Sequence, residues 1–201
     1  MKLSQHYMAA IELIDQAYQT EPNIEIYDGK SYPREYLYAQ RMVTELMTFQ
    51  PNASETELIA ARCQHLNRWD IPRTDYPNGR KGYHDWRTTL YDYQAQKAAD
   101  IMQKVGYDQQ SIDEVKAMVG KVHIKLNNQT QLIEDVACLV FLEYYIQPFV
   151  DKHKEDEIKL VRIIHRTWGK MSDKGHAAAL QLNIPKPILA LIMKALERKE
   201  S

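Results

Sequence analysis

The sequence lacks the features that mark several classes of protein. Its 201 residues include only two cysteines, Cys63 and Cys138, which are too far apart for a metal-binding CxxC pair. A disulfide framework is not expected either, and the chain suits a reducing, cytoplasmic setting. No stretch approaches the roughly 18 uninterrupted apolar residues of a membrane-spanning helix. The formal net charge of −1 gives no general cationic excess, so nucleic acid is not a favoured partner and a membrane surface is not expected.

Strand signals are also scarce, because short alternating runs of β-branched residues bounded by turns do not occur. Helical periodicity recurs from end to end instead. With 44% hydrophobic and 26% charged residues, the composition suits one sizeable buried core. We therefore predict an all-α fold in which residues 1–201 form a single-domain bundle of roughly eight or nine helices.

Capping patterns and helix breakers predict where these helices begin and end. Ser54 with Glu57, and Ser111 with Glu114, have the spacing of a capping box. Gly106 is placed to end a long helix, and residues 21–33 and 72–82 are rich in turn-forming residues and predict loops. Helices are predicted over residues 2–18, 35–49, 54–72, 83–105, 111–124, 131–148 and 156–168, then shortly after Ser172, and over 185–197.

Four side chains in the predicted bundle have the chemistry of metal ligands. His65 shares an inward helix face with apolar residues, and the pair His84 and Asp85 opens the next helix. Asp135 lies in the very apolar run LIEDVACLVFLEYYI, which predicts the central buried helix. Burying an unpaired carboxylate is costly, so Asp135 needs a cation, a metal ion or several donors.

Two imidazoles and two carboxylates suit a divalent transition metal, namely manganese, iron, cobalt, nickel or zinc. Water bound to such an ion becomes a competent nucleophile near neutral pH, which favours metal-assisted hydrolysis. Basic side chains surround the same segment and predict a phosphorylated substrate, because guanidinium groups bind phosphate oxygens in pairs. The predicted phosphate-binding residues are Arg62, Arg68, Arg73, Arg80, Lys81 and Arg87.

The ordered set of His65, His84-Asp85 and Asp135 resembles the signature of the HD-domain superfamily of metal-dependent phosphohydrolases. This resemblance implies a hydrolase of a nucleotide or another small phosphorylated metabolite, with Asp85 in catalysis. The segments ARCQHLNRWDIPR, GRKGYHDWR and EDVACLVFLEYY also resemble the domain of unknown function 4202 family, whose members have no assigned activity. That second resemblance covers most of the chain.

Two departures from the common HD pattern bear on catalysis. The His-Asp pair follows the polar loop YPNGRKG, and Thr88 lies where the nucleotidase-like branch commonly has an acid. Glu134 is therefore a candidate catalytic acid or base, with Glu143 as a substitute.

The same residues have structural interpretations that stay open. His65 can be a core histidine, and Asp135 can pair with Arg62 or another cation in a degenerate site. The three tryptophans can pack in the core or stack on bases, and His176 with Lys174 can form an anion site or a solvated helix cap. The alternative function is a non-catalytic module that binds a nucleotide or RNA. A third is an interaction surface built from some of the 13 tyrosines.

Overall fold

The computed structural model describes residues 3–197. Contacts within the chain divide it into two compact units, Met1–Ile133 and Glu134–Ser201. The expected all-α architecture is confirmed, whereas the expectation of a single domain stays a prediction. The first unit contains α1 (Gln5–Tyr18), β1 (Ile24–Tyr27), β2 (Lys30–Pro33), α2 (Arg34–Phe49), α3 (Glu55–Arg62), α4 (Arg80–Val105), α5 (Gln109–Val119) and the start of α6 (Asn128–Val140).

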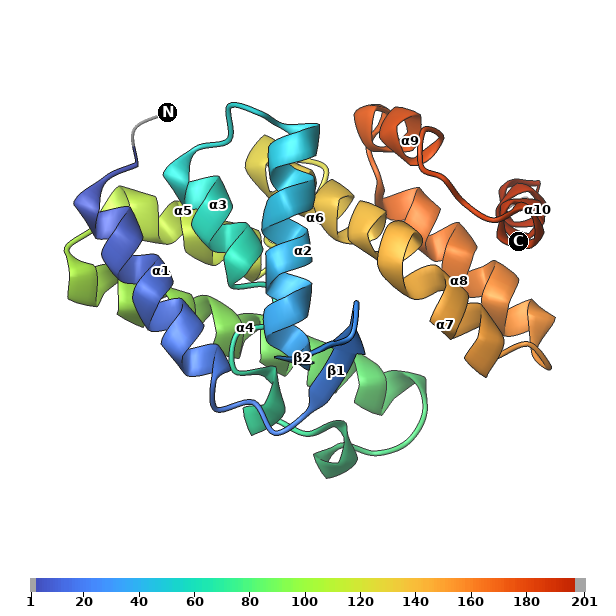
Figure 1. The fold of residues 1–201 in the computed structure, drawn as a ribbon, viewed down its shortest axis with the longest axis horizontal. Helices are drawn as coiled ribbons and strands as arrows, with labels where there is room; N and C mark the ends of the chain where they lie inside the picture. Colours follow the sequence, from blue (N-terminus) through green and yellow to red (C-terminus); the bar gives the residue numbers. More distant parts are fainter. Residues whose placement is uncertain (1–2, 198–201) are drawn as a thin grey trace. The chain divides into compact units, whose positions relative to one another are not determined.

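The first unit is built on α3, a short helix enclosed by its neighbours. It packs against α1, α2 and α5, while the long α4 packs against α1 and α5 (Figure 1). Full burial of one such apolar side chain contributes about 1.5–3 kcal/mol. The largest fully buried side chains of this unit are Ile14, Tyr18, Met42, Leu46, Ile59, Leu66, Leu90, Met102, Met118 and Ile133.

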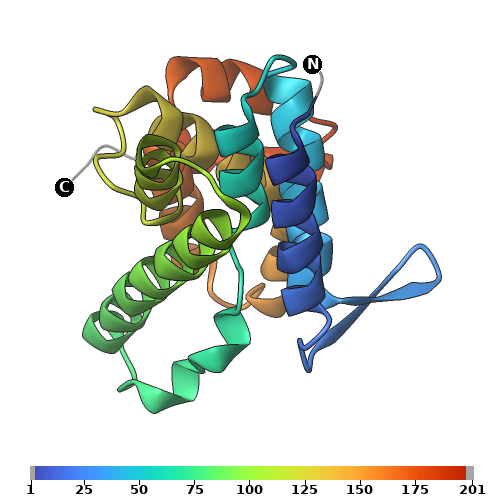
Figure 2. The same cartoon turned by 90° about the vertical axis from the view of Figure 1, so that its left-hand side faces the viewer.

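A small β-hairpin occupies part of the segment that the sequence predicts as a loop, so that prediction is wrong for residues 24–33. β1 and β2 pair antiparallel, and Asp28 and Gly29 between them have φ values of 49° and 70°. A two-residue turn of type I′ needs positive φ at both positions, which Asp-Gly provides. The hairpin projects from the helices of its unit (Figure 2). One face contacts α2, because Arg41 donates to Glu25 (2.9 Å) and stacks over Tyr27.

The two predicted capping boxes differ in outcome. Ser54 caps α3 as predicted, since its hydroxyl accepts the Glu57 N–H and the Glu57 carboxylate accepts the Ser54 N–H. The prediction for Ser111 is wrong. Asp108 caps α5 instead, and Ser111 donates its N–H (2.8 Å) and hydroxyl (3.1 Å) to that carboxylate.

Two helices end earlier than the sequence predicts. α3 ends at Arg62 rather than near Pro72, and Asn67 adopts the left-handed conformation (φ 53°) before two 3₁₀ turns, Arg68–Asp70 and Arg73–Asp75. α5 ends at Val119 rather than near residue 124, and Lys121 takes the left-handed position (φ 58°) that closes the helix. By contrast, α4 ends at Gly106 (φ 92°) as predicted. Each early end is followed by a residue that leaves the right-handed region.

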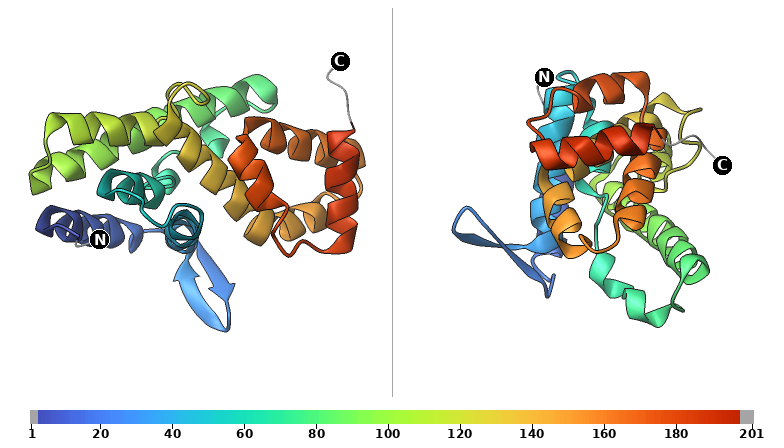
Figure 3. Two further views of the ribbon diagram at one scale, coloured as in Figure 1. Left: turned by 90° about the horizontal axis from the view of Figure 1, so that it is seen from above. Right: turned by 90° about the vertical axis from the view of Figure 1, so that its right-hand side faces the viewer.

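The second unit begins within α6 and continues through a π-helical segment (Phe141–Tyr145), α7 (Ile146–Lys152), α8 (Glu157–Lys170), α9 (Asp173–Ala179) and α10 (Lys186–Leu196). α10 packs against α7 and α8 (Figure 3). The π-helical turn lies directly before the first turn of α7, which contains Pro148. Because proline has no N–H, Pro148 cannot donate to the carbonyl of residue 144 in the π-helical segment, and the chain stays helical to Lys152 rather than ending at residue 148 as predicted.

Both cysteines are free and buried, Cys63 in the first unit and Cys138 in the second. Burial raises the pKa of the Cys63 thiol. Within residues 3–197, no helix combines the length and the apolar character needed to cross a membrane.

Candidate functional site

A carboxylate and an imidazole form the centre of the candidate site in the first unit. Glu35 lies in the first turn of α2, and His65 lies in the turn that follows α3. The Nδ1 atom of His65 is 2.6 Å from Oε2 of Glu35. Both side chains are largely buried, with exposed fractions of 21% for His65 and 10% for Glu35. A short contact of this kind fixes the direction in which the imidazole points.

The protonation states of this pair follow from their surroundings. Burial, and then Arg68, lower the pKa of His65 to about 4, so the ring is neutral at pH 7. Although burial raises the pKa of Glu35, His65, Arg68 and Arg34 together lower it to about 2. A neutral ring beside an ionised carboxylate has its one proton on Nδ1, where it donates to Glu35. The opposite nitrogen, Nε2, therefore presents a lone pair.

Neighbouring groups hold both members of the pair in place. The ring of Tyr38 stacks on His65 with centroids 3.9 Å apart and planes 12° apart. The backbone N–H of Glu35 donates to a carboxylate oxygen of Glu21 at 2.6 Å, which anchors the start of α2. Burial raises the pKa of Glu21. The orientation of Nε2 is thus set by contacts on several sides.

Two arginines place positive charge beside the imidazole. The Nε atom of Arg68 is 3.7 Å from Glu35, and its guanidinium lies 4.8 Å from the centre of the Trp86 ring. Arg87 donates from Nε to the Tyr91 hydroxyl at 3.0 Å, and its charge also lowers the pKa of His65. Such clusters of guanidinium groups next to an oriented imidazole are well suited to a phosphate group. We call Glu35, Tyr38, His65, Arg68, Trp86 and Arg87 the Glu35 cluster.

The other predicted phosphate-binding residues lie in different surroundings. Arg62 makes two hydrogen bonds to Asp15, at 2.8 and 2.7 Å. Arg73 donates to the carbonyl oxygens of residues 76 and 77, which closes the loop before α4. Arg80 and Lys81 are exposed at the start of α4. Of the six predicted basic residues, Arg68 and Arg87 thus lie in the Glu35 cluster.

The predicted metal ligands of the first unit differ in how far their side chains are exposed to solvent. The side chains of His84 and Asp85 are 80% and 50% exposed, with 3.9 Å between Nδ1 and Oδ1. His65 is largely buried and faces Glu35. Among residues 3–197, no group of three or more His, Cys, Asp or Glu side chains is placed to hold a metal ion. The metal centre therefore stays a prediction.

Asp135 belongs to the second unit and is 2% exposed. Its carboxylate accepts the N–H of Ser172 at 2.8 Å and the Ser172 hydroxyl at 2.5 Å. A side chain at Gly175 would bring its Cβ within 2.7 Å of the same carboxylate. Asp135 thus fixes the start of α9, and two donors from its own unit help to offset the cost of its burial. The neighbouring Glu134 forms an ion pair with Lys170 at 3.1 Å.

Comparison with known proteins identifies the family. Residues 8–192 match the family described as a domain of unknown function, DUF4202. The chain belongs to that family. Neither the curated proteins nor the solved structures contain a significant match. The resemblance to DUF4202 stated from the sequence is therefore confirmed, whereas the link to the HD superfamily stays a prediction.

Two of the aromatic residues of the DUF4202 chain have clear structural roles. Trp86 is 7% exposed and donates to the carbonyl of Ile71. Trp168 stacks on His176 with centroids 4.4 Å apart, and His176 Nε2 contacts the Trp168 carbonyl oxygen. Ser172 caps α9 in the same region. These contacts favour the structural interpretation of Trp168 and His176.

Sequence reasoning missed Glu35, the residue that organises the cluster. The sequence offered only a weak indication that Glu35 belongs to a site. An acidic residue in the first turn of a helix is commonly explained by its favourable interaction with the helix dipole. That interpretation explains the residue without His65, which lies 30 positions further along the chain.

Proposed function

We propose that this DUF4202 protein is a phosphohydrolase that acts on a phosphomonoester of a small metabolite at the Glu35 cluster. The observation that carries the proposal is the 2.6 Å contact between Glu35 and Nδ1 of His65, beside the guanidinium of Arg68. It supplies an oriented base and a cation next to each other. The order of His65, His84-Asp85 and Asp135, which resembles the HD signature, supports the same class of reaction.

Arg68 and Arg87 are proposed to bind the phosphate oxygens. Binding a dianion beside His65 offsets the positive charges that lower its pKa in the free protein. The imidazole therefore becomes a stronger base once the substrate is in place.

In the proposed reaction, Nε2 of His65 takes a proton from a water molecule as its oxygen attacks phosphorus. The bond from phosphorus to the substrate oxygen breaks, and the departing oxygen receives the proton from the imidazolium. The products are an alcohol and inorganic phosphate, and His65 is again neutral. Glu35 stabilises the transient imidazolium and keeps Nδ1 protonated throughout.

The metal-dependent form of the reaction remains part of the proposal. It would use the predicted ligands His65, His84 and Asp85 of the first unit, with manganese, iron, cobalt, nickel or zinc as the ion. No step above depends on that ion. The metal-dependent form requires Asp85 as a ligand, whereas the metal-free form does not require Asp85.

The test is hydrolysis of a panel of phosphomonoesters by purified protein, with metal content measured and with manganese, cobalt or nickel added in parallel. His65→Asn and Arg68→Met are expected to lower kcat/KM by about 100-fold or more. Arg162→Gln, at an exposed arginine of α8 in the second unit, is the matched control and keeps full activity. Loss of activity in Asp85→Asn together with bound metal supports the metal-dependent form. No turnover of any ester under all conditions contradicts the proposal.

A second candidate function is a non-catalytic module that binds a nucleotide or RNA. The observation that favours it is the guanidinium of Arg68 over the Trp86 ring, because arginine both stacks on aromatic faces and binds phosphate groups in nucleic-acid recognition. A nucleotide that raises the melting temperature, is not consumed, and loses its effect in Arg68→Met supports this candidate. Affinity for RNA that falls steeply with salt extends it to nucleic acid.

A further inference from the structure

We propose that Tyr83 is a specificity-determining residue that stacks on a planar ring of the substrate, which makes a nucleoside monophosphate the preferred class of phosphomonoester. This inference rests on the proposed phosphate site in the Glu35 cluster. It concerns the part of the substrate that the arginines do not bind.

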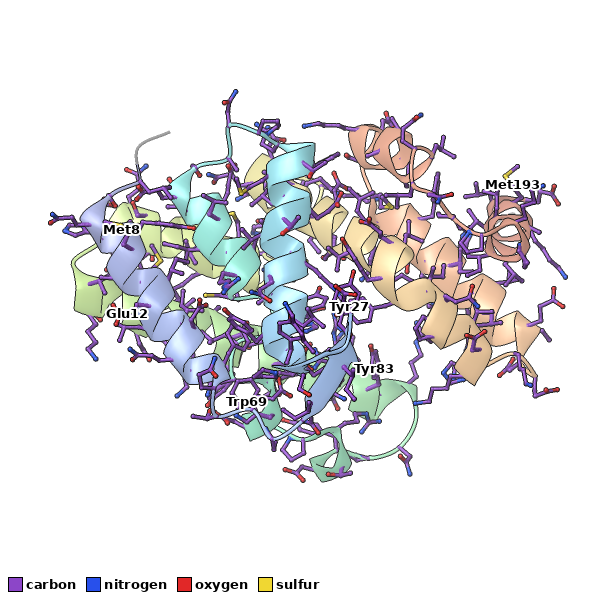
Figure 4. All side chains as sticks on the ribbon, in the orientation of Figure 1. Met8, Glu12, Tyr27, Trp69, Tyr83 and Met193 are labelled. Atoms are coloured by element: carbon purple, nitrogen blue, oxygen red, sulfur yellow. The ribbon has the colours of Figure 1, made fainter. Side chains whose placement is uncertain are left out.

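The first observation is an exposed aromatic ring backed by a buried one. Tyr83 is 50% exposed, whereas Trp86 beside it is 7% exposed. Their ring centroids are 5.8 Å apart with planes at 51°. The buried tryptophan limits the orientations of the tyrosine, so little freedom is lost when a ligand stacks on its open side. Figure 4 labels Tyr83 near the start of α4.

The second observation is the distance from this ring to the proposed phosphate ligands. Tyr83 and Arg87 are four residues apart on α4 and therefore share one helix face, with their backbone positions about 6 Å apart along the axis. The guanidinium of Arg68 lies over the Trp86 ring, which Tyr83 also contacts. The Tyr83 hydroxyl acts to raise the pKa of Arg68. The exposed ring and the proposed phosphate ligands are therefore neighbours, as a ligand that joins a base to a phosphate requires.

The plain alternative is a surface tyrosine with no ligand. Tyr27 on the hairpin provides the matched case, since it is 46% exposed and also lies next to an arginine. That arginine, Arg41, is paired with Glu25. Tyr27 therefore resembles Tyr83 in exposure, but its neighbour Arg41 is not part of the Glu35 cluster, which makes Tyr27 the control position.

The test compares binding of adenosine 5′-monophosphate and ribose 5-phosphate to the full chain by titration calorimetry. The nucleotide is expected to bind about tenfold more tightly, which is about 1.4 kcal/mol, because its base stacks on the tyrosine ring. Tyr83→Leu removes this preference, Tyr83→Phe retains it, and Tyr27→Leu leaves it unchanged. Thermal unfolding of each variant confirms that it is folded.

The outcomes separate this inference from the proposed function. Equal affinity for the two ligands, or an unchanged preference in Tyr83→Leu, overturns the role of Tyr83 while the phosphate site stands. If neither ligand binds to the wild-type chain, the proposed phosphate site fails and the inference fails with it. Ribose 5-phosphate binding that is lost in Arg68→Met shows that the phosphate site itself is real.

Discussion

The two carboxylate oxygens of Glu35 contact different partners. Oε2 contacts His65, and Oε1 lies 3.7 Å from both Arg34 and Arg68. A carboxylate this buried is stable only when paired, so the cluster and its charge state depend on each other. Removal of Glu35 therefore disturbs the base and the proposed phosphate ligands together.

Replacement of Glu35 by Gln is predicted to lower kcat/KM by about 100-fold. A glutamine amide can present its NH₂ group to Nδ1, which moves the ring proton to Nε2 and leaves no lone pair for the attacking water. Nitrogen chemical shifts of the imidazole report this change of tautomer. Glu25→Gln, which alters the carboxylate paired with Arg41 on the hairpin, is the control and keeps full activity. Equal activity in Glu35→Gln and wild type contradicts the proposed role of Glu35.

His65 is predicted to make the protein less stable as the pH falls from about 6.5 to about 4. Its pKa is about 4 in the folded chain against an ordinary value of 6.5, so the unfolded chain binds the proton first within this window. The free energy of unfolding then decreases by up to about 3 kcal/mol as the pH is lowered. Denaturant titrations at several pH values measure this loss of stability. In His65→Asn, the loss between pH 6.5 and 4 is expected to be smaller by the contribution of His65. An identical loss in the variant shows that His65 does not titrate as described.

At the scale of single residues, the sequence predicted part of the candidate site. It singled out His65, Arg68 and Arg87 from their residue types and from their nearness along the chain. It missed Glu35 and Tyr38, because hydrogen-bonding and stacking partners 30 and 27 positions away have no local signature. For Asp135 it predicted a cation, a metal ion or several donors, and the N–H and the hydroxyl of Ser172 are two such donors.

Helices were the elements that the sequence predicted best, because an apolar stripe is repeated over many residues and single errors average out. Short elements depend on one or two residues and were less predictable. The hairpin rests on Asp28-Gly29, and the early end of α3 precedes a left-handed Asn67. An Asp-Gly pair between β-forming runs is a hairpin signal that helical periodicity in the flanking segments concealed.

The helix caps give a prediction that distinguishes two candidates for the start of α5. Asp108→Ala is expected to lower the free energy of unfolding by about 1 kcal/mol, because it removes the acceptor for the Ser111 N–H. Ser54→Ala should cost about the same at α3. Ser111→Ala should cost clearly less, since its hydroxyl is a donor to Asp108 and not the cap. Chemical denaturation measures all three, and a larger loss in Ser111→Ala than in Asp108→Ala contradicts the assigned cap.

Two glycines with open surroundings test the backbone requirement of the hairpin. A Cβ at Gly29 or at Gly169 meets no atom within 4 Å, so neither substitution creates a clash. Gly29 has φ +70°, and Gly29→Ala should destabilise the hairpin by about 1 kcal/mol. Gly169 lies in α8, and Gly169→Ala should stabilise its helix by up to about 1 kcal/mol. Hydrogen exchange of the amides in each element measures both effects, which should have opposite signs.

At the scale of the whole molecule, the hydrophobic pattern predicted an all-α chain without a membrane-spanning helix, and residues 3–197 agree apart from the small hairpin. The sequence did not predict that contacts divide the chain into the units Met1–Ile133 and Glu134–Ser201. The boundary falls inside α6, a continuous helix, so no turn-rich linker marks it. Such a division depends on the density of contacts between distant segments, which composition does not report.

Each unit contains one of the two sulfhydryl groups of the chain, 0% exposed at Cys63 and 5% exposed at Cys138. An alkylating reagent can reach either sulfur atom only when the surrounding unit opens. In native buffer, both are expected to react at least about 100-fold more slowly than in the unfolded chain, as followed by mass spectrometry of the two peptides. Rapid labelling of either peptide contradicts its burial. The chain therefore carries a built-in reporter of opening in each half, and neither an added dye nor an engineered cysteine is needed to follow them separately.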